Sequence, residues 1–253
     1  MRAKRFFVLM NARSGSTWLI TLLNGQPGVA AYEELLLPHP VKAKYAWLAE
    51  GAPERFHSRR DHLAGPRPLK FWRYLAEVEA HRAGMASCGF KINAVQFRAT
   101  PELLPILAVR GYRLVVLVRN NVFESSVSQM MMRISGEAHG REAGDHAPVT
   151  LEPAEVLSRI RRRLRWIAAC RTVRRAWPHP SAEVSYEALV ADQGTALAPV
   201  LRAIGVDALP VAVESPLKRR IDRPYAEIVS NYAEVAAAVR GADLARYLPE
   251  AAA

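Results

Sequence analysis

The feature that most constrains this chain is a short apolar run that passes directly into a loop of small polar residues. Residues 5–10 read Arg-Phe-Phe-Val-Leu-Met, and residues 11–18 read Asn-Ala-Arg-Ser-Gly-Ser-Thr-Trp. A continuous apolar run bounded by turn-forming residues is typical of a buried strand in a parallel sheet. Residues 16–23 then have the apolar spacing of a helix. The pattern predicts a strand, a loop and a helix in immediate succession.

Short apolar runs alternate with helical patterns along the rest of the chain. Further strands are predicted at residues 88–92, 112–118 and 182–185, and further helices at residues 40–50, 69–82, 101–109, 121–133, 153–177, 187–204 and 224–240. Residues 51–68 and 135–150 are predicted to be loops. This alternation predicts an α/β fold of three layers, P-loop-like, with a central parallel sheet flanked by helices. The length of 253 residues is compatible with a single domain over residues 1–253.

The composition limits where the protein works and what it binds. The apolar run at residues 6–10 is too short for a secretory signal, and no run is long enough to span a membrane, so we expect a cytoplasmic protein. Cys88 and Cys170 lie in apolar patterns without metal-ligand spacing, which predicts buried free thiols and no metal site. The formal net charge of +11 fits a solvated basic surface, an anionic ligand or nucleic acid.

The loop after the first strand carries more anion-binding groups than a helix cap requires. A helix N-terminus presents unpaired N–H groups and the positive end of a dipole. Gly15 lets the backbone approach an anion, Arg13 adds a planar cation, and hydroxyls come from Ser14, Ser16 and Thr17. An ordinary cap needs one such residue. The run therefore predicts a phosphate-binding loop.

This loop differs from the one that binds ATP in P-loop kinases. The pattern Gly-x4-Gly-Lys-Ser/Thr is absent, and so are its lysine and an obvious magnesium ligand. Such a loop is poorly equipped to neutralise a triphosphate, which favours a less charged group. A nucleotide kinase with a degenerate loop is the enzyme alternative.

A second anion site is predicted where the strand at residues 112–118 ends. Arg119 follows this strand, and the next predicted helix carries Ser125, Ser126 and Ser128. An arginine at the carboxyl end of a strand, beside a helix N-terminus, can bind an anion.

Residues 7–29 resemble the opening of sulfotransferases that use 3′-phosphoadenosine 5′-phosphosulfate (PAPS), especially the carbohydrate and bacterial branch. In that family the loop binds the 5′-phosphosulfate of the donor, which implies this role for Arg13, Ser14, Gly15, Ser16, Thr17 and Trp18. Val116-Leu-Val-Arg119, followed by Ser128, is similar to the family's 3′-phosphate motif, with Ser125 and Ser126 as alternatives to Ser128. Two anion sites match one donor with two anionic groups.

The resemblance also suggests the groups that act on the acceptor. Glu34 stands where related carbohydrate sulfotransferases have their proposed base, and Glu33 replaces a common glycine and is a candidate substrate-binding residue. Lys91, in Gly89-Phe-Lys91, resembles a lysine that binds sulfuryl oxygens or an acidic acceptor. Arg13 is expected to stabilise charge on the bridging oxygen, since arginine hardly gives up its proton. Glu33 and three loop histidines are alternative bases: His57, His62 and His139.

The late part of the chain resembles the family less closely. Residues 184–190 are similar to a structural strand and helix start, and residues 217–224 to a basic segment that covers the nucleotide, which implicates Lys218 and Arg219. Residues 37–85 and 134–150 match nothing alignable and are the variable regions where acceptor specificity is expected.

The implied reaction is transfer of the sulfuryl group of PAPS to a hydroxyl of a carbohydrate or natural-product-like acceptor, by in-line attack with a carboxylate base and release of PAP, without a metal. The alternative from another class is a basic nucleic-acid-binding module that uses the arginines of residues 159–175. No nucleic-acid motif is present, so nucleic acid is not an expected partner. The same arginines are also interpreted as a solvated face or as an attractor of a polyanionic acceptor.

Overall fold

The computed structural model describes residues 3–37, 51–81, 84–135, 148–214 and 223–249. The chain divides into two compact units. Unit 1 comprises Met1–Val118 and Cys170–Glu214, and unit 2 comprises Arg119–Ala169 and Ser215–Ala253. Each unit is described separately below.

Unit 1 is built around a parallel sheet of five strands in the order β2-β3-β1-β4-β5. The strands are β1 (Lys4–Met10), β2 (Val29–Tyr32), β3 (Ser87–Asn93), β4 (Arg113–Val118) and β5 (Ser181–Ser185). Its helices are α1 (Ser16–Asn24), α2 (Phe56–Arg59), the 3₁₀ helix η2 (Arg60–His62), α3 (Arg67–His81), α4 (Ala94–Ala99), α5 (Leu103–Val109), α8 (Tyr186–Ala191) and α9 (Gln193–Ile204).

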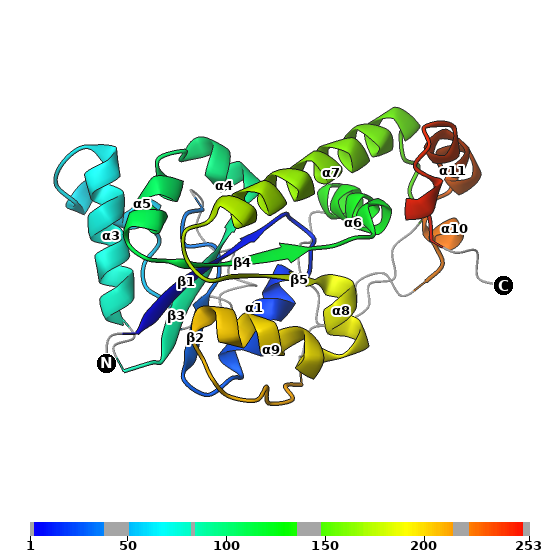
Figure 1. Cartoon of the computed structure of the whole chain (residues 1–253). Coiled ribbons are helices and arrows are strands. Elements are labelled where there is room, and N and C mark those ends of the chain that lie inside the picture. Colours follow the sequence, from blue (N-terminus) through cyan, green and yellow to red (C-terminus); the bar gives the residue numbers. More distant parts are fainter. Residues whose placement is uncertain (1–2, 38–50, 82–83, 136–147, 215–222, 250–253) are drawn as a thin grey trace. The chain divides into compact units, whose positions relative to one another are not determined.

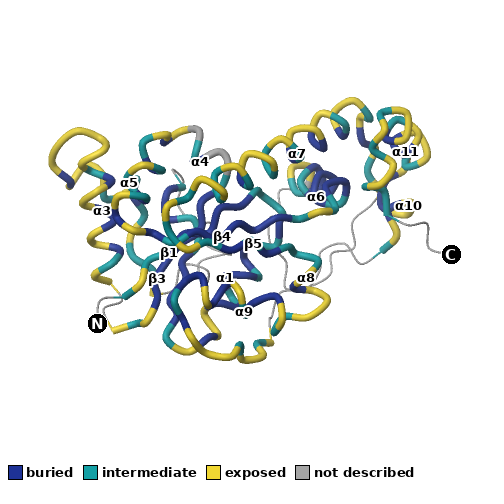
Figure 2. The backbone as a smooth tube through the Cα atoms, viewed as in Figure 1, coloured by how far each residue is buried: buried dark blue, intermediate teal, exposed yellow. Residues whose placement is uncertain are grey.

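Helices cover both faces of this sheet, which confirms the predicted three-layer α/β fold (Figure 1). Phe6, Val8 and Met10 of β1 pack in one core cluster with α1 and α9. Phe7 points to the other face and meets the ring of Trp177 edge-on, with centroids 5.2 Å apart. Both faces of β1 are therefore buried, so its sequence is continuously apolar instead of alternating. Figure 2 shows the strands as the buried centre of the unit.

Unit 2 is helical, and its elements are α6 (Val122–Ser135), most of α7 (Pro153–Ala176), α10 (Tyr225–Ile228), α11 (Tyr232–Gly241) and η3 (Ala245–Tyr247). A second core cluster joins α6, α7, α10 and α11. Within it, the ring of Phe123 lies edge-on to the ring of Tyr225, with centroids 5.5 Å apart.

Most predicted elements are present, and the differences have local causes. The strand β2 and the helix α4 are not predicted from the sequence. β2 has only four residues, two of them alanine, and α4 has only six residues directly after a strand, so neither shows a clear periodicity. The predicted loop at 51–68 contains α2 and η2. The helix predicted at 224–240 is interrupted because Val229 forms a bridge with Val149, which separates α10 from α11. The helix predicted at 40–50 and most of the loop predicted at 135–150 lie outside the described residues.

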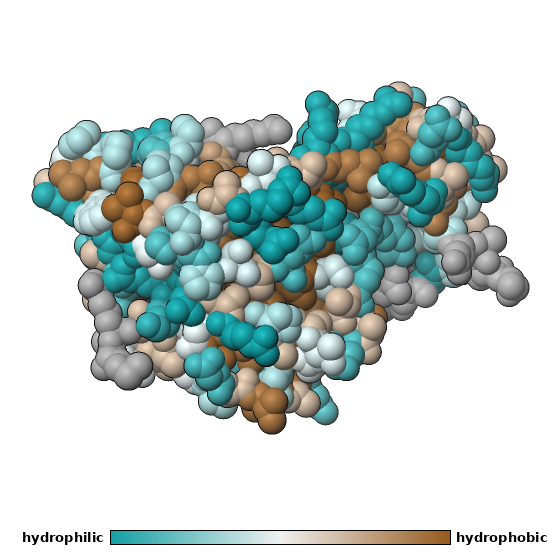
Figure 3. All heavy atoms as spheres, viewed as in Figure 1, coloured by the Kyte–Doolittle hydropathy of each residue, from teal (hydrophilic) through white to brown (hydrophobic). Residues whose placement is uncertain are grey.

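Cys88 and Cys170 are both free and buried, as predicted. Burial raises the pKa of the Cys170 thiol to about 12, so this thiol is not a nucleophile at neutral pH. Within the described ranges, no group of three histidine, cysteine or acidic residues could hold a metal ion. None of the helices in these same ranges combines the length and the apolar character needed to cross a membrane. In Figure 3 the hydrophobic side chains on the visible face form separate patches among hydrophilic ones.

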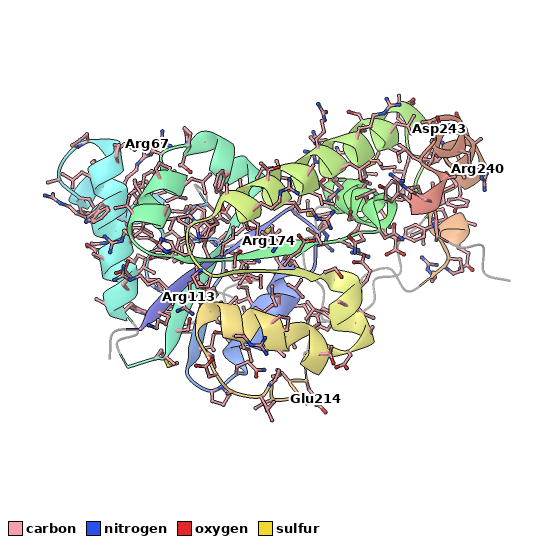
Figure 4. All side chains as sticks on the ribbon, in the orientation of Figure 1. Arg67, Arg113, Arg174, Glu214, Arg240 and Asp243 are labelled. Carbon is pink, nitrogen blue, oxygen red and sulfur yellow. The ribbon has the colours of Figure 1, made fainter. Side chains whose placement is uncertain are left out.

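The arginines of α7 have several different environments, so they do not form one basic face. In unit 2, Arg159 and Arg163 are buried, and Arg163 Nη2 donates to the Ser125 carbonyl oxygen at 2.9 Å. In unit 1, Arg171 and Arg174 form ion pairs with Glu183 at 2.7 and 3.6 Å (Arg174 is labelled in Figure 4). The exposed arginines of this helix are Arg161, Arg162, Arg165 and Arg175.

Candidate active site

The carboxyl ends of the parallel strands in unit 1 share one edge of the sheet. The residues there are polar: the loop 11–15 follows β1, Glu33 and Glu34 follow β2, and Asn93 ends β3. Met10 is the register partner of Asn93, so the loop and the end of β3 are neighbours. Open α/β sheets bind their ligands outside the carboxyl ends of the strands. This edge is therefore the candidate active site.

The loop has the backbone geometry of an anion cradle. Arg13 and Gly15 both have positive φ, 64° and 84°. Left-handed residues in such a turn direct successive N–H groups into one concavity, which binds anions. A non-glycine residue with positive φ is strained, and such strain is concentrated at functional sites. Gly15 is also sterically required, because a Cβ there would lie 2.5 Å from Cδ2 of Tyr186.

The N-terminus of α1 has donors that the helix does not use. No side chain of a described residue caps α1, so the interpretation of Ser14 or Ser16 as an ordinary cap does not hold. Ser14 is 1% exposed, and its Oγ has no hydrogen-bond partner in the part of the chain that the structure describes. A buried hydroxyl without a partner costs roughly 1–3 kcal/mol. An uncapped helix N-terminus beside an unsatisfied hydroxyl fits a phosphate-like group.

Lys91 supplies a lysine, which the loop sequence itself lacks. The lysine is 2% exposed at the end of β3, and its Nζ donates to Ser16 Oγ at 3.3 Å and to Thr17 Oγ1 at 3.1 Å. Its Nζ also forms a short ion pair with Glu33 Oε2. Lys91 is thus buried against the loop, and Glu33 is the carboxylate that balances its charge.

Glu34 lies beside this network and is held by one of its two carboxylate oxygens. Oε2 accepts hydrogen bonds from Asn93 Nδ2 at 2.8 Å and from Gln96 Nε2 at 3.4 Å. Burial, as the largest influence, raises the pKa of Glu34, Glu33 raises it further, and Lys91, Asn93 and Arg55 lower it. A carboxyl group with a raised pKa is a stronger base once ionised, which suits proton abstraction.

Two aromatic side chains border the loop. The rings of Trp18 and Tyr186 meet edge-on with centroids 5.6 Å apart, and the Tyr186 ring lies next to Gly15. The sequence predicts a binding role for Trp18 and only a structural role for Tyr186. The position of Tyr186, directly after a strand, is the signal that could have identified it.

Of the histidines predicted as alternative bases, the two that the structure describes do not lie at the strand ends that form this edge of the sheet. His57 lies on α2 with its ring edge-on to Phe56 at 5.7 Å. His62 is exposed on η2, and His139 lies outside the described residues.

The predicted second anion site belongs to unit 2. Arg119 Nη2 forms an ion pair with Glu124 Oε2 at 2.6 Å. The hydroxyls of Ser125 and Ser126 both donate to the Val122 carbonyl oxygen, at 3.2 and 2.7 Å. Ser128 is buried. The predicted Lys218 and Arg219 lie outside the described residues.

Comparison with known proteins decides the family of the chain. The model of the sulfotransferase family matches residues 5–210. The chain belongs to the sulfotransferase family. It is therefore a sulfotransferase enzyme. The family match favours sulfuryl transfer over the alternative of phosphoryl transfer by a kinase.

Solved structures are also similar to this sulfotransferase. A sulfotransferase from Alicyclobacillus acidocaldarius has 15% identity and a TM-score of 0.47, with 96% of each chain covered. The sulfotransferase domain from the curacin biosynthetic pathway has 17% identity and a TM-score of 0.49, over 89% of this chain and 80% of that domain. A mouse sulfotransferase complexed with PAP has 13% identity and a TM-score of 0.42, over 82% of this chain and 61% of the mouse protein. No curated protein matches.

Proposed function

We propose that this sulfotransferase moves the sulfuryl group of PAPS to a hydroxyl of a carbohydrate or natural-product-like acceptor, with Glu34 as the base. The observation that carries the proposal is the hydrogen-bonded group at the sheet edge. There, Lys91 donates hydrogen bonds to Ser16 and Thr17 at the uncapped start of α1 and forms an ion pair with Glu33. Glu34 is the next residue in the chain. The same edge of the sheet thus carries both hydrogen-bond donors for an anion and a carboxylate that can act as the base.

The loop residues are the proposed ligands of the 5′-phosphosulfate. Arg13, Ser14 and Gly15 provide the strained backbone turn and the unsatisfied hydroxyl, and Ser16 and Thr17 begin α1, whose first N–H groups point out of the helix. In PAPS the sulfuryl group is bonded to an oxygen of the 5′-phosphate. PAP, which keeps that oxygen, is the leaving group. Trp18, with Tyr186, offers an aromatic surface on which a purine base can stack.

In the transfer itself, Glu34 accepts the proton of the acceptor's hydroxyl. The acceptor oxygen forms a bond to sulfur, the bond between sulfur and the bridging oxygen breaks, and the electron pair leaves with PAP. Lys91 and Arg13 stabilise the negative charge that develops on the sulfuryl and bridging oxygens. These residues need no metal ion for this step, because the two cations are fixed in the protein.

For unit 2, we propose that Arg119 and Ser128 bind the 3′-phosphate and that Lys218 and Arg219 cover the nucleotide. Ser128 is chosen because its spacing from Arg119 resembles that of the family's 3′-phosphate motif, and Ser125 and Ser126 are the alternatives. The family match includes parts of both units, which supports one sulfotransferase domain over residues 1–253. The variable regions 37–85 and 134–150 would then select the acceptor.

Two measurements test the proposal. PAP, added well above micromolar concentration, should raise the melting temperature, since a ligand that binds only the folded state stabilises it. Release of PAP from PAPS, measured with a panel of sugars, phenols and alcohols, should identify acceptors. Glu34→Gln should lose roughly 10²–10⁴-fold in this turnover and keep its PAP binding. No thermal shift with PAP or PAPS would refute the donor assignment, and full turnover by Glu34→Gln would refute the base.

A further inference from the structure

Asn93 and Gln96 form a reciprocal pair at the start of α4. Asn93 Oδ1 accepts the backbone N–H of Gln96 at 3.1 Å, and Gln96 Oε1 accepts the backbone N–H of Asn93 at 2.9 Å. This is the arrangement of a capping box, in which two side chains satisfy each other's backbone donors. Both side-chain oxygens are thereby used.

The pair fixes the direction of both amide NH₂ groups. An amide whose oxygen accepts a backbone N–H must present its NH₂ group on the other side. Asn93 Nδ2 and Gln96 Nε2 both donate to the same oxygen, Oε2 of Glu34. Oε1 of Glu34 makes no hydrogen bond with any residue that the structure describes.

We propose that Asn93 and Gln96 are positioning residues, an amide clamp that holds Glu34 by Oε2 and keeps Oε1 available for the acceptor's proton. The clamp rests on the proposed role of Glu34 as base. It acts through Glu34 and does not itself contact the reacting atoms. Nothing in the sequence spacing alone connects these residues, because Asn93 and Glu34 are 59 positions apart.

Neutral donors suit this task because Glu34 already lies among several charges. Lys91 faces it from β3, Arg55 from the segment before α2, and Glu33 from its own segment. The hydrogen bond from Asn93 and the two cations oppose the effect of burial, so they lower the pKa of Glu34. Amide donors do not titrate and add no net charge. The clamp therefore keeps the carboxylate ionised without an additional close cation, which would weaken its basicity.

The decisive variant is Asn93→Ser. Serine is a good N-cap, and its Oγ can still accept the backbone N–H of Gln96, but it has no NH₂ group for Glu34. The titration of Glu34 is followed by NMR of ¹³C-labelled glutamate carboxyls, with its signal identified by its loss in Glu34→Gln. The clamp predicts that the pKa of Glu34 rises by about one pH unit. Asn93→Asp keeps the shape and the cap, places a carboxylate against Glu34, and should raise the pKa further.

The matched control is Thr100→Val. It removes the hydrogen bond from Thr100 Oγ1, just after α4, to the Gln96 carbonyl oxygen at 2.7 Å, without touching Glu34. Its Glu34 signal should titrate as in the unmodified protein. The clamp is wrong if Asn93→Ser leaves the titration unchanged, or if Thr100→Val shifts it equally. Should Asn93→Ser not fold, Gln96→Met removes the other amide donor to Oε2 without adding a charge and should also raise the pKa of Glu34, and an unchanged titration would contradict the clamp.

Turnover of PAPS separates this inference from the proposed function. The acidic limb of the pH–rate profile should move upward together with the NMR titration in Asn93→Ser. If the titration moves and the limb does not, the clamp stands and the assignment of Glu34 as base falls.

Discussion

The two predicted anion sites are both strand-to-helix junctions, yet their side chains are arranged differently. At the junction of β1 and α1, a cation, Lys91, comes from a neighbouring strand, and among the described residues no side chain caps the helix and the Ser14 hydroxyl has no partner. At the start of unit 2, the cation Arg119 comes from the junction itself and is paired with Glu124. Each cation is paired with a carboxylate, Lys91 with Glu33 and Arg119 with Glu124, but Lys91 is almost completely buried and Arg119 is less so.

This difference predicts different consequences when the cation is removed. Lys91 forms an ion pair with Glu33, and their side chains are only 3% and 14% exposed. Removing the lysine therefore leaves the buried charge of Glu33 uncompensated. Lys91→Met should reduce the free energy of unfolding by about 3–5 kcal/mol, measured by urea denaturation. Adding Glu33→Gln to this variant should restore part of the stability. A loss below about 1 kcal/mol would mean that the pair is not effectively buried.

The next largest effect is expected at Gly15. Gly15→Ala places a side chain at φ 84° and 2.5 Å from the Tyr186 ring, so both strain and overlap destabilise the loop. We expect a loss of about 2–3 kcal/mol and a loss of PAP binding by calorimetry. Gly111→Ala is the matched control, since its φ is 75° and its Cβ would meet nothing within 4 Å. Equal losses in both variants would show that the contact with Tyr186 has no part in the effect.

At the second site, ligand affinity should change more than stability. Arg119→Ala should weaken PAP binding by about 10–100-fold, because a charge-assisted hydrogen bond is lost. Glu124→Gln should strengthen it by roughly 3–10-fold, since the competing carboxylate charge is removed. Calorimetric titration with PAP checks both variants. Weaker binding in Glu124→Gln would mean that Glu124 orients Arg119 and does not compete for it.

The smallest expected effect is the pH dependence that Glu34 adds to stability. Its pKa is raised in the folded protein, so the folded state holds the proton more tightly than the unfolded chain. The stability from this proton is complete below the unfolded value of 4.5 and is lost as the pH rises through the folded value. Denaturation of Glu34→Gln should therefore show a flatter stability profile above pH 4.5. Parallel profiles for the two proteins would contradict the raised pKa.

The strands that bury both faces could be predicted from the sequence, because they leave continuous apolar runs. β1 and β4 are of this kind. β2 is also buried along its whole length but has only four residues, and β5 alternates between buried and half-buried positions. The loop was found from its residue types alone. The environment of Glu34 could not be predicted in this way, because no sequence pattern connects Asn93 and Gln96 to residue 34.

The sequence by itself determined the α/β class and the family resemblance, and it predicted an anion-binding loop, since each depends on residues close together in the chain. Only the tertiary structure decided how a lysine reaches the start of α1. The strand order places β3 beside β1, and this brings Lys91 to Thr17 across 74 positions. The same packing divides the arginines of α7 into buried and exposed ones. Sheet order depends on contacts between distant segments, and no local pattern of residues specifies it.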